Sequence, residues 1–178
     1  MRLRRIGLVL AAVVAVAGAA IGLGLRPLRL ALLRYGVRAR FPEVRTISTA
    51  ELAAWRADAG RVQPLVLDVR EPAEFAVSHL AGSRSLPLAQ AGPSAIADTP
   101  RDRPIVVYCS VGLRSAIAAR ALQRGGFTQV QNLEGSIFQW ANEARPLVRS
   151  DGSPADTVHP YDARWGRLLA PERRAPLR

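Results

Sequence analysis

Short apolar runs alternate with mixed apolar and polar stretches through the middle of the chain. The runs at residues 64–69 and 105–108 have the length of strands, and residues 127–132 form a third expected strand. Nearly unbroken apolar runs are typical of strands that helices cover on both faces of a sheet. The expected helices start near residues 48, 71, 115 and 136. This alternation predicts an α/β fold with a parallel sheet flanked by helices.

Local signals place the ends of several elements. Ser48 and Glu51 have the spacing of a capping box, which opens a helix. Pro72 stands in the first turn of the next helix, where its missing N–H does no harm. Residues 86–88 are expected to form a short strand, followed by an irregular helical connection over residues 89–99. No internal repeat is apparent.

Cys109 is the only cysteine in the chain, and it stands where a strand ends and a helix is about to begin. A thiol in such a turn faces backbone N–H groups and the positive end of the helix dipole, and both favour the thiolate. Because the thiolate is the reactive form, this placement predicts a nucleophile at the carboxyl edge of the sheet, where α/β folds bind ligands. The alternative is a buried cysteine that acts as a small apolar residue.

The turn after Cys109 can hold an anion without a specialised side chain. Backbone N–H groups of residues 110–114 can surround the anion, and Gly112 allows a tight curl because glycine adopts positive φ at little cost. Arg114 has two alternative roles, since it either attracts an anionic substrate or pairs with a carboxylate and supports the loop. The candidate loop residues are Ser110, Val111, Gly112, Leu113 and Arg114.

Four segments follow one another in an order that is typical of one protein family. They are LVLDVREPAEF at residues 65–75, SHLAGSRSLPL at residues 78–88, CSVGLR at residues 109–114 and NLEGSIFQW at residues 132–140. Over residues 46–148 the chain therefore resembles the rhodanese-like domain family of single-cysteine sulfurtransferases. One position departs from the pattern, because Ser136 stands where the family often carries a second glycine.

The resemblance implies a rhodanese-like parallel sheet of about five strands and a sulfurtransferase activity. Cys109 would take a sulfur atom from a small donor such as thiosulfate or mercaptopyruvate and carry it as a sulfane sulfur. It would then pass this sulfur, from a persulfide, to cyanide, a thiol or an acceptor protein. No cofactor is expected. The alternative is a non-catalytic or redox-sensing module that uses the fold to bind a partner at the membrane.

The length of the loop bears on the reaction that the resemblance implies. Cys109 and Arg114 have the Cys-x4-Arg spacing of sulfurtransferases, whereas related phosphatases and arsenate reductases use one residue more to surround a tetrahedral oxyanion. The shorter loop favours sulfur transfer. Ser110, Val111 and Leu113 are neutral where some thiosulfate-specific relatives carry basic residues, so thiosulfate is not favoured as the physiological donor.

Other polar residues near the expected site have structural explanations. Asp68 either orients the loop backbone or joins Arg70 and Glu74 in an ion network, and the network is preferred. His79 is expected to satisfy a turn, and Trp140 is expected in the core of the last helix. No cluster of His, Cys and Asp has the spacing of metal ligands, so no metal is expected. Asp68 and Arg70 are therefore interpreted as supporting residues.

The net charge of +11 is unevenly distributed. Residues 1–45 hold nine of the 25 basic residues and one of the 14 acidic residues, whereas residues 46–148 hold ten basic and nine acidic residues. The expected domain is nearly neutral, which argues against nucleic-acid binding. A single cysteine excludes an intramolecular disulfide, so the stability of the domain must come from its core.

Much of the basic charge surrounds an apolar N-terminal segment. Residues 6–25 carry no charged side chain and would span about 30 Å as a helix, which matches the hydrocarbon core of a bilayer. They are expected to form a single transmembrane helix. A cleaved secretory signal is the alternative, because basic residues precede the segment and residues 15–20 are rich in small side chains. The arginines after the segment favour a cytoplasmic domain over an exported one.

Two further segments flank the expected domain. Residues 26–45 are a basic juxtamembrane stretch with interleaved leucine and arginine, as in a helix at lipid headgroups, and a solvated linker is the alternative. Residues 149–178 are a C-terminal extension whose aromatic and aliphatic residues are unusual in a solvated tail. Part of this extension is expected to dock on the domain, on the membrane or on a partner. The chain is thus expected to consist of a transmembrane anchor or uncleaved signal (residues 1–25), a basic juxtamembrane segment (26–45), a rhodanese-like domain (46–148) and a C-terminal extension (149–178).

Overall fold

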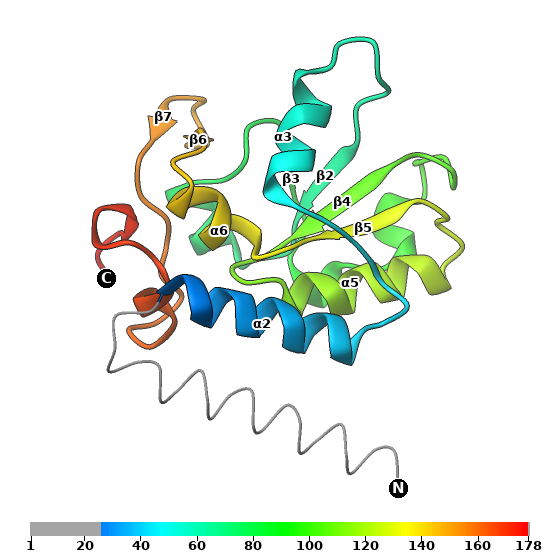
Figure 1. Cartoon of the computed structure of the whole chain (residues 1–178). Helices are drawn as coiled ribbons and strands as arrows, with labels where there is room; N and C mark the ends of the chain where they lie inside the picture. Colours follow the sequence, from blue (N-terminus) through cyan, green and yellow to red (C-terminus); the bar gives the residue numbers. More distant parts are fainter. Residues whose placement is uncertain (1–25, 178) are drawn as a thin grey trace, which may run out of the picture.

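The computed structural model describes residues 26–177 of the chain. The segment that is expected to span a membrane, residues 6–25, lies outside the described residues. Within residues 26–177, no helix is both long enough and apolar enough to cross a bilayer. Figure 1 shows a central sheet with helices on both of its faces.

The five-stranded sheet is parallel throughout, and its strand order is β1-β5-β4-β2-β3. The central strand β4 is buried along its whole length, which explains its unbroken apolar sequence. The strands are β1 (Arg45–Ile47), β2 (Leu65–Asp68), β3 (Arg84–Ser85), β4 (Ile105–Tyr108) and β5 (Val130–Leu133). The predicted α/β fold with about five parallel strands is confirmed.

Alternate residues of β4 face two hydrophobic clusters, one on each side of the sheet. The helices are α2 (Arg26–Arg40), α3 (Thr49–Ala57), α4 (Pro72–Val77), α5 (Leu113–Arg124) and α6 (Ser136–Asn142). Val106 and Tyr108 pack with α3 and α6 in the first cluster. Ile105 and Val107 pack with α5 in the second cluster, which also contains Cys109. The cysteine therefore lies on the α5 side of the sheet.

Three strands differ from the sequence prediction. The strand Arg45–Ile47 is too short for a periodic signal, and it is held by its pairing with β5. The prediction of a strand at residues 86–88 is wrong, because the strand lies at Arg84–Ser85 and the chain turns into a 3-10 helix at Leu88. β5 begins later than predicted, because the N–H of Phe127 still bonds to the end of α5.

Two glutamates set the starts of α3 and α4. At α3, Ser48 Oγ accepts the Glu51 N–H (3.1 Å) and Glu51 Oε2 accepts the Ser48 N–H (2.8 Å), so the predicted capping box is confirmed. At α4, Glu74 Oε2 accepts the Glu71 N–H at 3.1 Å. Glu74 is thus held by its own helix as well as by the contacts described below.

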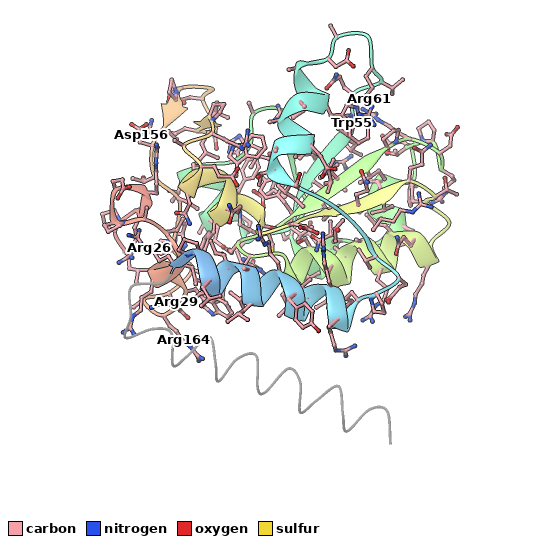
Figure 2. All side chains as sticks on the ribbon, viewed as in Figure 1. Arg26, Arg29, Trp55, Arg61, Asp156 and Arg164 are labelled. Carbon is pink, nitrogen blue, oxygen red and sulfur yellow. The ribbon has the colours of Figure 1, made fainter. Side chains whose placement is uncertain are left out.

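The end of α3 is closed by the loop that follows it. Trp55 Nε1 donates to the carbonyl of Val62 at 2.9 Å. Figure 2 shows Arg61 beside Trp55, and its guanidinium carbon lies 3.8 Å from the ring centroid. Cation–π contact and the hydrogen bond together keep this tryptophan against the core.

The helix α2 packs on the domain. Leu30 is buried in the first cluster, and Arg38 forms an ion pair with Glu134. Leu28 and Tyr35 are exposed. Residues 26–40 therefore form an ordered helix with one face on the protein, and the solvated-linker alternative is wrong for them.

The C-terminal extension also packs on the domain. Val158 and Leu169 are fully buried in the first cluster. Asn142 of α6 fastens the extension, because its Nδ2 donates to the Leu168 carbonyl and its Oδ1 accepts the Ala170 N–H, both at 2.8 Å. Docking on the domain, one of the three predicted alternatives, is confirmed. The elements of this region are the antiparallel pair β6 (Leu147–Val148) and β7 (Pro154–Ala155) and the 3-10 helices η4 (Trp165–Leu168) and η5 (Pro171–Arg173).

Candidate active site

The turn after β4 lies at the carboxyl edge of the sheet, between the ends of β2 and β5. β4 ends at Tyr108 and α5 begins at Leu113, so Cys109 is the first residue of the connection. Cys109 is only 1% exposed, but it lines a cavity of about 150 Å³. Its sulfur is therefore sheltered from bulk water and approached through that cavity.

Two donors of the same loop and helix point at the sulfur. The Gly112 N–H donates to Cys109 Sγ at 3.1 Å, and Ser115 Oγ donates to it at 3.5 Å. Hydrogen bonds to a charged acceptor are stronger than those to a neutral one, so both contacts favour a sulfur that carries negative charge. The sequence predicted the loop amides for this role but assigned Ser115 to the start of the helix.

Gly112 has the conformation that the tight turn requires. Its φ is +106°, in the region that favours glycine, whereas a Cβ at this position would meet nothing closer than 3.7 Å. The constraint is therefore the backbone angle and not a lack of space. Asn132 at the end of β5 fixes the turn further, because its Nδ2 donates to the Gly112 carbonyl at 3.0 Å.

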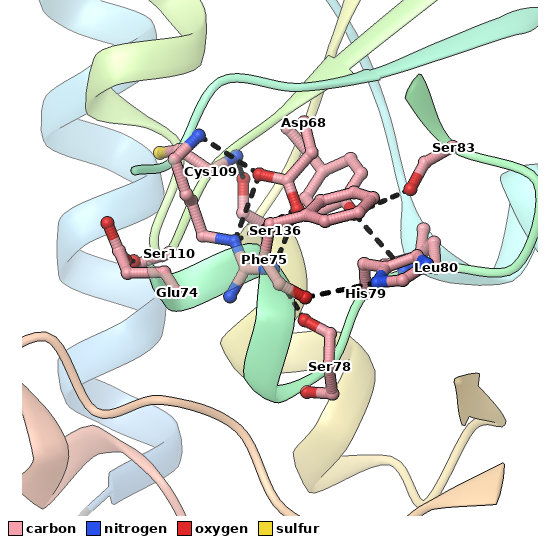
Figure 3. Close-up of polar contacts among 12 residues, drawn as sticks. Asp68, Glu74, Phe75, Ser78, His79, Leu80, Ser83, Cys109, Ser110 and Ser136 are labelled. Carbon is pink, nitrogen blue, oxygen red and sulfur yellow. Dashed lines mark hydrogen bonds and ion pairs between the residues drawn. The ribbon is translucent and has the colours of Figure 1, made fainter. Parts of the chain in front are cut away.

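The first residues of α6 hold the other side of the loop. Ser136 Oγ accepts the Cys109 N–H at 3.2 Å and donates to the Leu133 carbonyl at 3.0 Å, and Figure 3 shows Ser136 next to Cys109. The N–H groups of Ile137 and Phe138 donate to the carbonyls of Cys109 and Ser110 at 3.2 and 3.1 Å. Ser136 has a φ of +51°, so a glycine would also fit its backbone, while its hydroxyl adds a contact that glycine cannot make.

Arg114 pairs with a carboxylate. Its Nη1 and Nη2 donate to Glu74 Oε2 and Oε1 at 2.7 and 2.9 Å, and its Nη2 also donates to Ser110 Oγ at 2.9 Å. Ser110 Oγ in turn donates to Glu74 Oε1 at 3.0 Å. The structure therefore contains the carboxylate pairing of the second alternative, with Glu74 as the partner.

The pair has shifted pKa values. Burial raises the pKa of Glu74, but the hydrogen bonds and charge of Arg114 outweigh burial, and the pKa of Glu74 is lowered overall. Burial lowers the pKa of Arg114, whereas its hydrogen bonds to Glu74, the electrostatic contribution of Cys109 and the charge of Glu74 raise it, so the pKa of Arg114 is raised overall. Both groups are charged at neutral pH.

Asp68 and Arg70 form a separate ion pair whose two side chains are fully buried. Arg70 Nη2 donates to Asp68 Oδ2 and to the Ser78 carbonyl, each at 2.7 Å, and the Arg70 N–H donates to Asp68 Oδ1 at 3.0 Å. The predicted network of Asp68, Arg70 and Glu74 is thus divided, because Glu74 makes its ion pair with Arg114. The Asp68 pair orders the connection between β2 and α4.

His79 and Trp140 have structural contacts. His79 stacks on Phe75 with ring centroids 3.7 Å apart, and its Nδ1 bonds to the Phe75 carbonyl at 3.1 Å (Figure 3). Its backbone pairs with Val148 of β6. Trp140 is buried in the first cluster and its Nε1 donates to the Pro146 carbonyl at 2.9 Å.

The cavity above the sulfur includes residues from outside the predicted domain. Its lining consists of Cys109, Ser110, Val111, Leu113, Arg114, Tyr161 and Trp165. Tyr161 and Trp165 come from the C-terminal extension, and no motif in the sequence assigned them to the site. The available signal was the aromatic content of the extension, which indicated docking but not the place of docking.

A comparison with family models matches residues 48–143 to the rhodanese-like domain. A protein named sulfurtransferase from Allochromatium vinosum is 36% identical over 88 residues, which are 49% of this chain and 81% of that protein. The thiosulfate sulfurtransferase GlpE of Stutzerimonas stutzeri is 37% identical over 87 residues, which are 49% of this chain and 79% of that protein.

Two further relatives extend the comparison. The probable adenylyltransferase/sulfurtransferase MoeZ of Mycobacterium tuberculosis is 39% identical over 103 residues. These residues are 57% of this chain, and the match spans only 26% of MoeZ. The crystal structure of a rhodanese-related protein from Thermoplasma volcanium superposes with a TM-score of 0.51 at 32% identity. That match covers 58% of this chain and 97% of the other, which agrees with the fold described above.

Proposed function

Because the chain belongs to the rhodanese-like domain family, we propose that it is a sulfurtransferase that carries a sulfane sulfur on Cys109. The environment of the sulfur supports the proposal most strongly. Cys109 Sγ accepts hydrogen bonds from Gly112 and Ser115 at one end of a small cavity. A thiolate held in this way can attack a small sulfur donor and retain the anionic product.

In the first step, the Cys109 thiolate attacks the outer sulfur of the donor. A bond forms between Sγ and that sulfur, the donor's own bond to the sulfur breaks, and the electron pair leaves with the remainder of the donor. With thiosulfate the leaving group is sulfite, and with an organic persulfide it is a thiolate. The enzyme then carries Cys–S–S⁻, whose single negative charge equals that of the original thiolate.

In the second step, an acceptor such as cyanide or a thiolate attacks the outer sulfur of the persulfide. The bond between the two sulfurs breaks, and its electron pair returns to Cys109 as the thiolate. Cyanide becomes thiocyanate, and an acceptor thiolate becomes a persulfide. No redox partner or cofactor enters this balance.

The remaining loop residues keep the persulfide pocket in shape. Arg114 and Ser110 are joined through Glu74, so the arginine positions the loop while its charge is already balanced. Val111 and Leu113 place apolar side chains along the cavity. In this proposal the anion is stabilised by the backbone of the loop and by Ser115.

We also propose that residues 6–25 anchor the protein in a membrane, with the domain on the cytoplasmic side. The uncharged length of this segment supports the proposal, and so do the arginines that follow it. The segment leads directly into α2, which begins at Arg26 and exposes Leu28 near its start. An exposed leucine among arginines suits a helix that enters the headgroup region.

The activity is tested by the rate of thiocyanate formation from cyanide with thiosulfate, mercaptopyruvate and an organic persulfide as donors. Cys109→Ser removes the only thiol of the chain, so no other cysteine can supply background transfer. The wild type should transfer sulfur from at least one donor, and the serine variant should transfer none. Equal rates for the two proteins would refute the covalent mechanism. A wild type that is inactive with every donor would contradict the enzyme and favour the partner-binding module.

A further inference from the structure

The cavity above the sulfur has one wall that the rhodanese-like domain does not supply. The family match covers residues 48–143, whereas Tyr161 and Trp165 belong to the C-terminal extension. Their rings join Val111 and Leu113 around the cavity. The entrance to the sulfur is therefore largely apolar and is shaped by a segment specific to the extension.

The two aromatic residues are held in place. Trp165 packs against the first hydrophobic cluster, and its backbone N–H donates to Asp162 Oδ1 at 2.8 Å. Tyr161 has a φ of +67°, which is unusual for a bulky residue, and its N–H donates to His159 Nδ1 at 3.0 Å. Its ring is half exposed and lies 5.1 Å from the guanidinium carbon of Arg114. A strained backbone that places an exposed ring at a cavity indicates a functional position.

The charges of the cavity do not suit a small inorganic dianion. Arg114 is the one cationic side chain among the described residues that line it, and both of its terminal nitrogens already bond to Glu74. A dianion would lose its water in an apolar entrance without gaining an unpaired cation. An uncharged apolar group, in contrast, gains by leaving water there.

We propose that Tyr161 and Trp165 make this site selective for a donor whose sulfane sulfur is attached to an apolar carbon body about the size of one aromatic ring. This inference rests on the proposed sulfurtransferase function of Cys109. A cavity of about 150 Å³ with apolar walls accommodates a group of the size of benzene. The two aromatic rings can pack on it edge-on or with an offset, while the sulfane sulfur points to the loop.

The turnover test uses the full-length chain in lipid nanodiscs, so that no free detergent competes for the cavity. Benzenethiosulfonate and methanethiosulfonate each give up one sulfane sulfur, and the remainder of each donor leaves as a sulfinate. The two donors differ only in the group on the sulfonyl sulfur, which is a phenyl ring in one and a methyl group in the other. The wild type should prefer the aromatic donor at least about tenfold in kcat/KM. Tyr161→Ala and Trp165→Leu should each lower this preference by a factor of about 3 to 10. Tyr35→Ala, which removes an exposed tyrosine outside the cavity lining, should leave it unchanged.

A binding test separates this inference from the proposed activity. The Cys109→Ser protein is titrated calorimetrically with benzenesulfonate and methanesulfonate, which carry no sulfane sulfur. Tighter binding of benzenesulfonate that Tyr161→Ala abolishes supports the aromatic wall even if no donor is turned over. In that case only the proposed sulfur transfer fails. Equal binding of the two sulfonates, or a preference that survives both Tyr161→Ala and Trp165→Leu, overturns the inference.

Discussion

Replacing Glu74 by glutamine removes the charge that holds Arg114 while the size of the side chain stays the same. The carboxylate accepts two hydrogen bonds from Arg114, one from Ser110 and one from the Glu71 N–H. Glutamine can accept on one oxygen only, and its amide group would face donors. The Glu74→Gln protein should therefore keep its fold but lose stability.

The magnitude follows from the exposure of the pair. The side chain of Glu74 is 3% exposed and that of Arg114 is 21% exposed, so water screens the arginine in part. A hydrogen bond to a charged group contributes about 1.5–3 kcal/mol, and the lower part of that range, about 2 kcal/mol, is expected for the substitution. For a domain of this size, that loss lowers the unfolding midpoint by about 4–8 °C.

Thermal unfolding followed by circular dichroism at a series of pH values measures this effect. Because the pKa of Glu74 is lowered in the folded protein, the carboxylate stabilises the fold above its ordinary pKa of 4.5, and this stabilisation is lost as the pH falls through the lower folded value. The unfolding midpoint of the wild type should thus be higher than that of Glu74→Gln at pH 7, and the two midpoints should approach each other in acid. Glu43→Gln is the control, since the exposed pair of Glu43 and Arg120 is 3.8 Å apart and should contribute less than about 1 kcal/mol. Equal unfolding midpoints for Glu74→Gln and the wild type at pH 7 would refute the reasoning. A difference between the two midpoints that persists in acid would refute it as well.

Three further predictions concern the loop and the membrane. Gly112→Ala should cost about 1–2 kcal/mol in unfolding free energy and stop persulfide formation. Gly126→Ala is the control, at another left-handed glycine (φ +90°) in open space, and it should cost a similar amount and leave transfer intact. Equal transfer by both variants would count against a special loop geometry. Ser136→Gly and Ser136→Ala both lose the hydroxyl, but only glycine relieves the strain of the positive φ. In denaturant titrations the glycine variant should therefore be more stable than the alanine variant by about 1 kcal/mol, and the reverse order would contradict this. The full-length chain should stay with membranes through high-salt and carbonate washes, and a chain that starts at residue 26 should not; a mature N-terminus after residue 20 would show a cleaved signal instead.

The sequence predicted the parts of the fold that depend on local patterns. The apolar run of β4 and the capping box at Ser48 are local signals, and both are confirmed. The strand β1 could not be found in this way, because it is short and exists through its pairing with β5. The β6–β7 pair is local in the sequence, but each of its strands has only two residues, which is too few for a periodic signal.

The residues of the loop could be predicted from the sequence, but the contacts that other segments make with the loop could not. The strand-turn-helix placement of Cys109 and the flexibility of Gly112 follow from neighbouring residues. The partner of Arg114 was left open, since any of several carboxylates could reach it, and the structure selects Glu74 through the position of α4. Tyr161 and Trp165 were not assigned, because their approach to the sulfur depends on how the extension folds back.

Intact-mass spectrometry of the protein after incubation with a sulfane donor tests the persulfide on Cys109 most directly. After excess donor is removed, the wild type should be heavier by the mass of one sulfur atom, and peptide mapping should place this mass on Cys109. Cyanide should remove the added mass, and Cys109→Ser should never acquire it. A wild type that gains no mass from any donor, or a serine variant that gains the same mass, would contradict sulfur transfer through this cysteine.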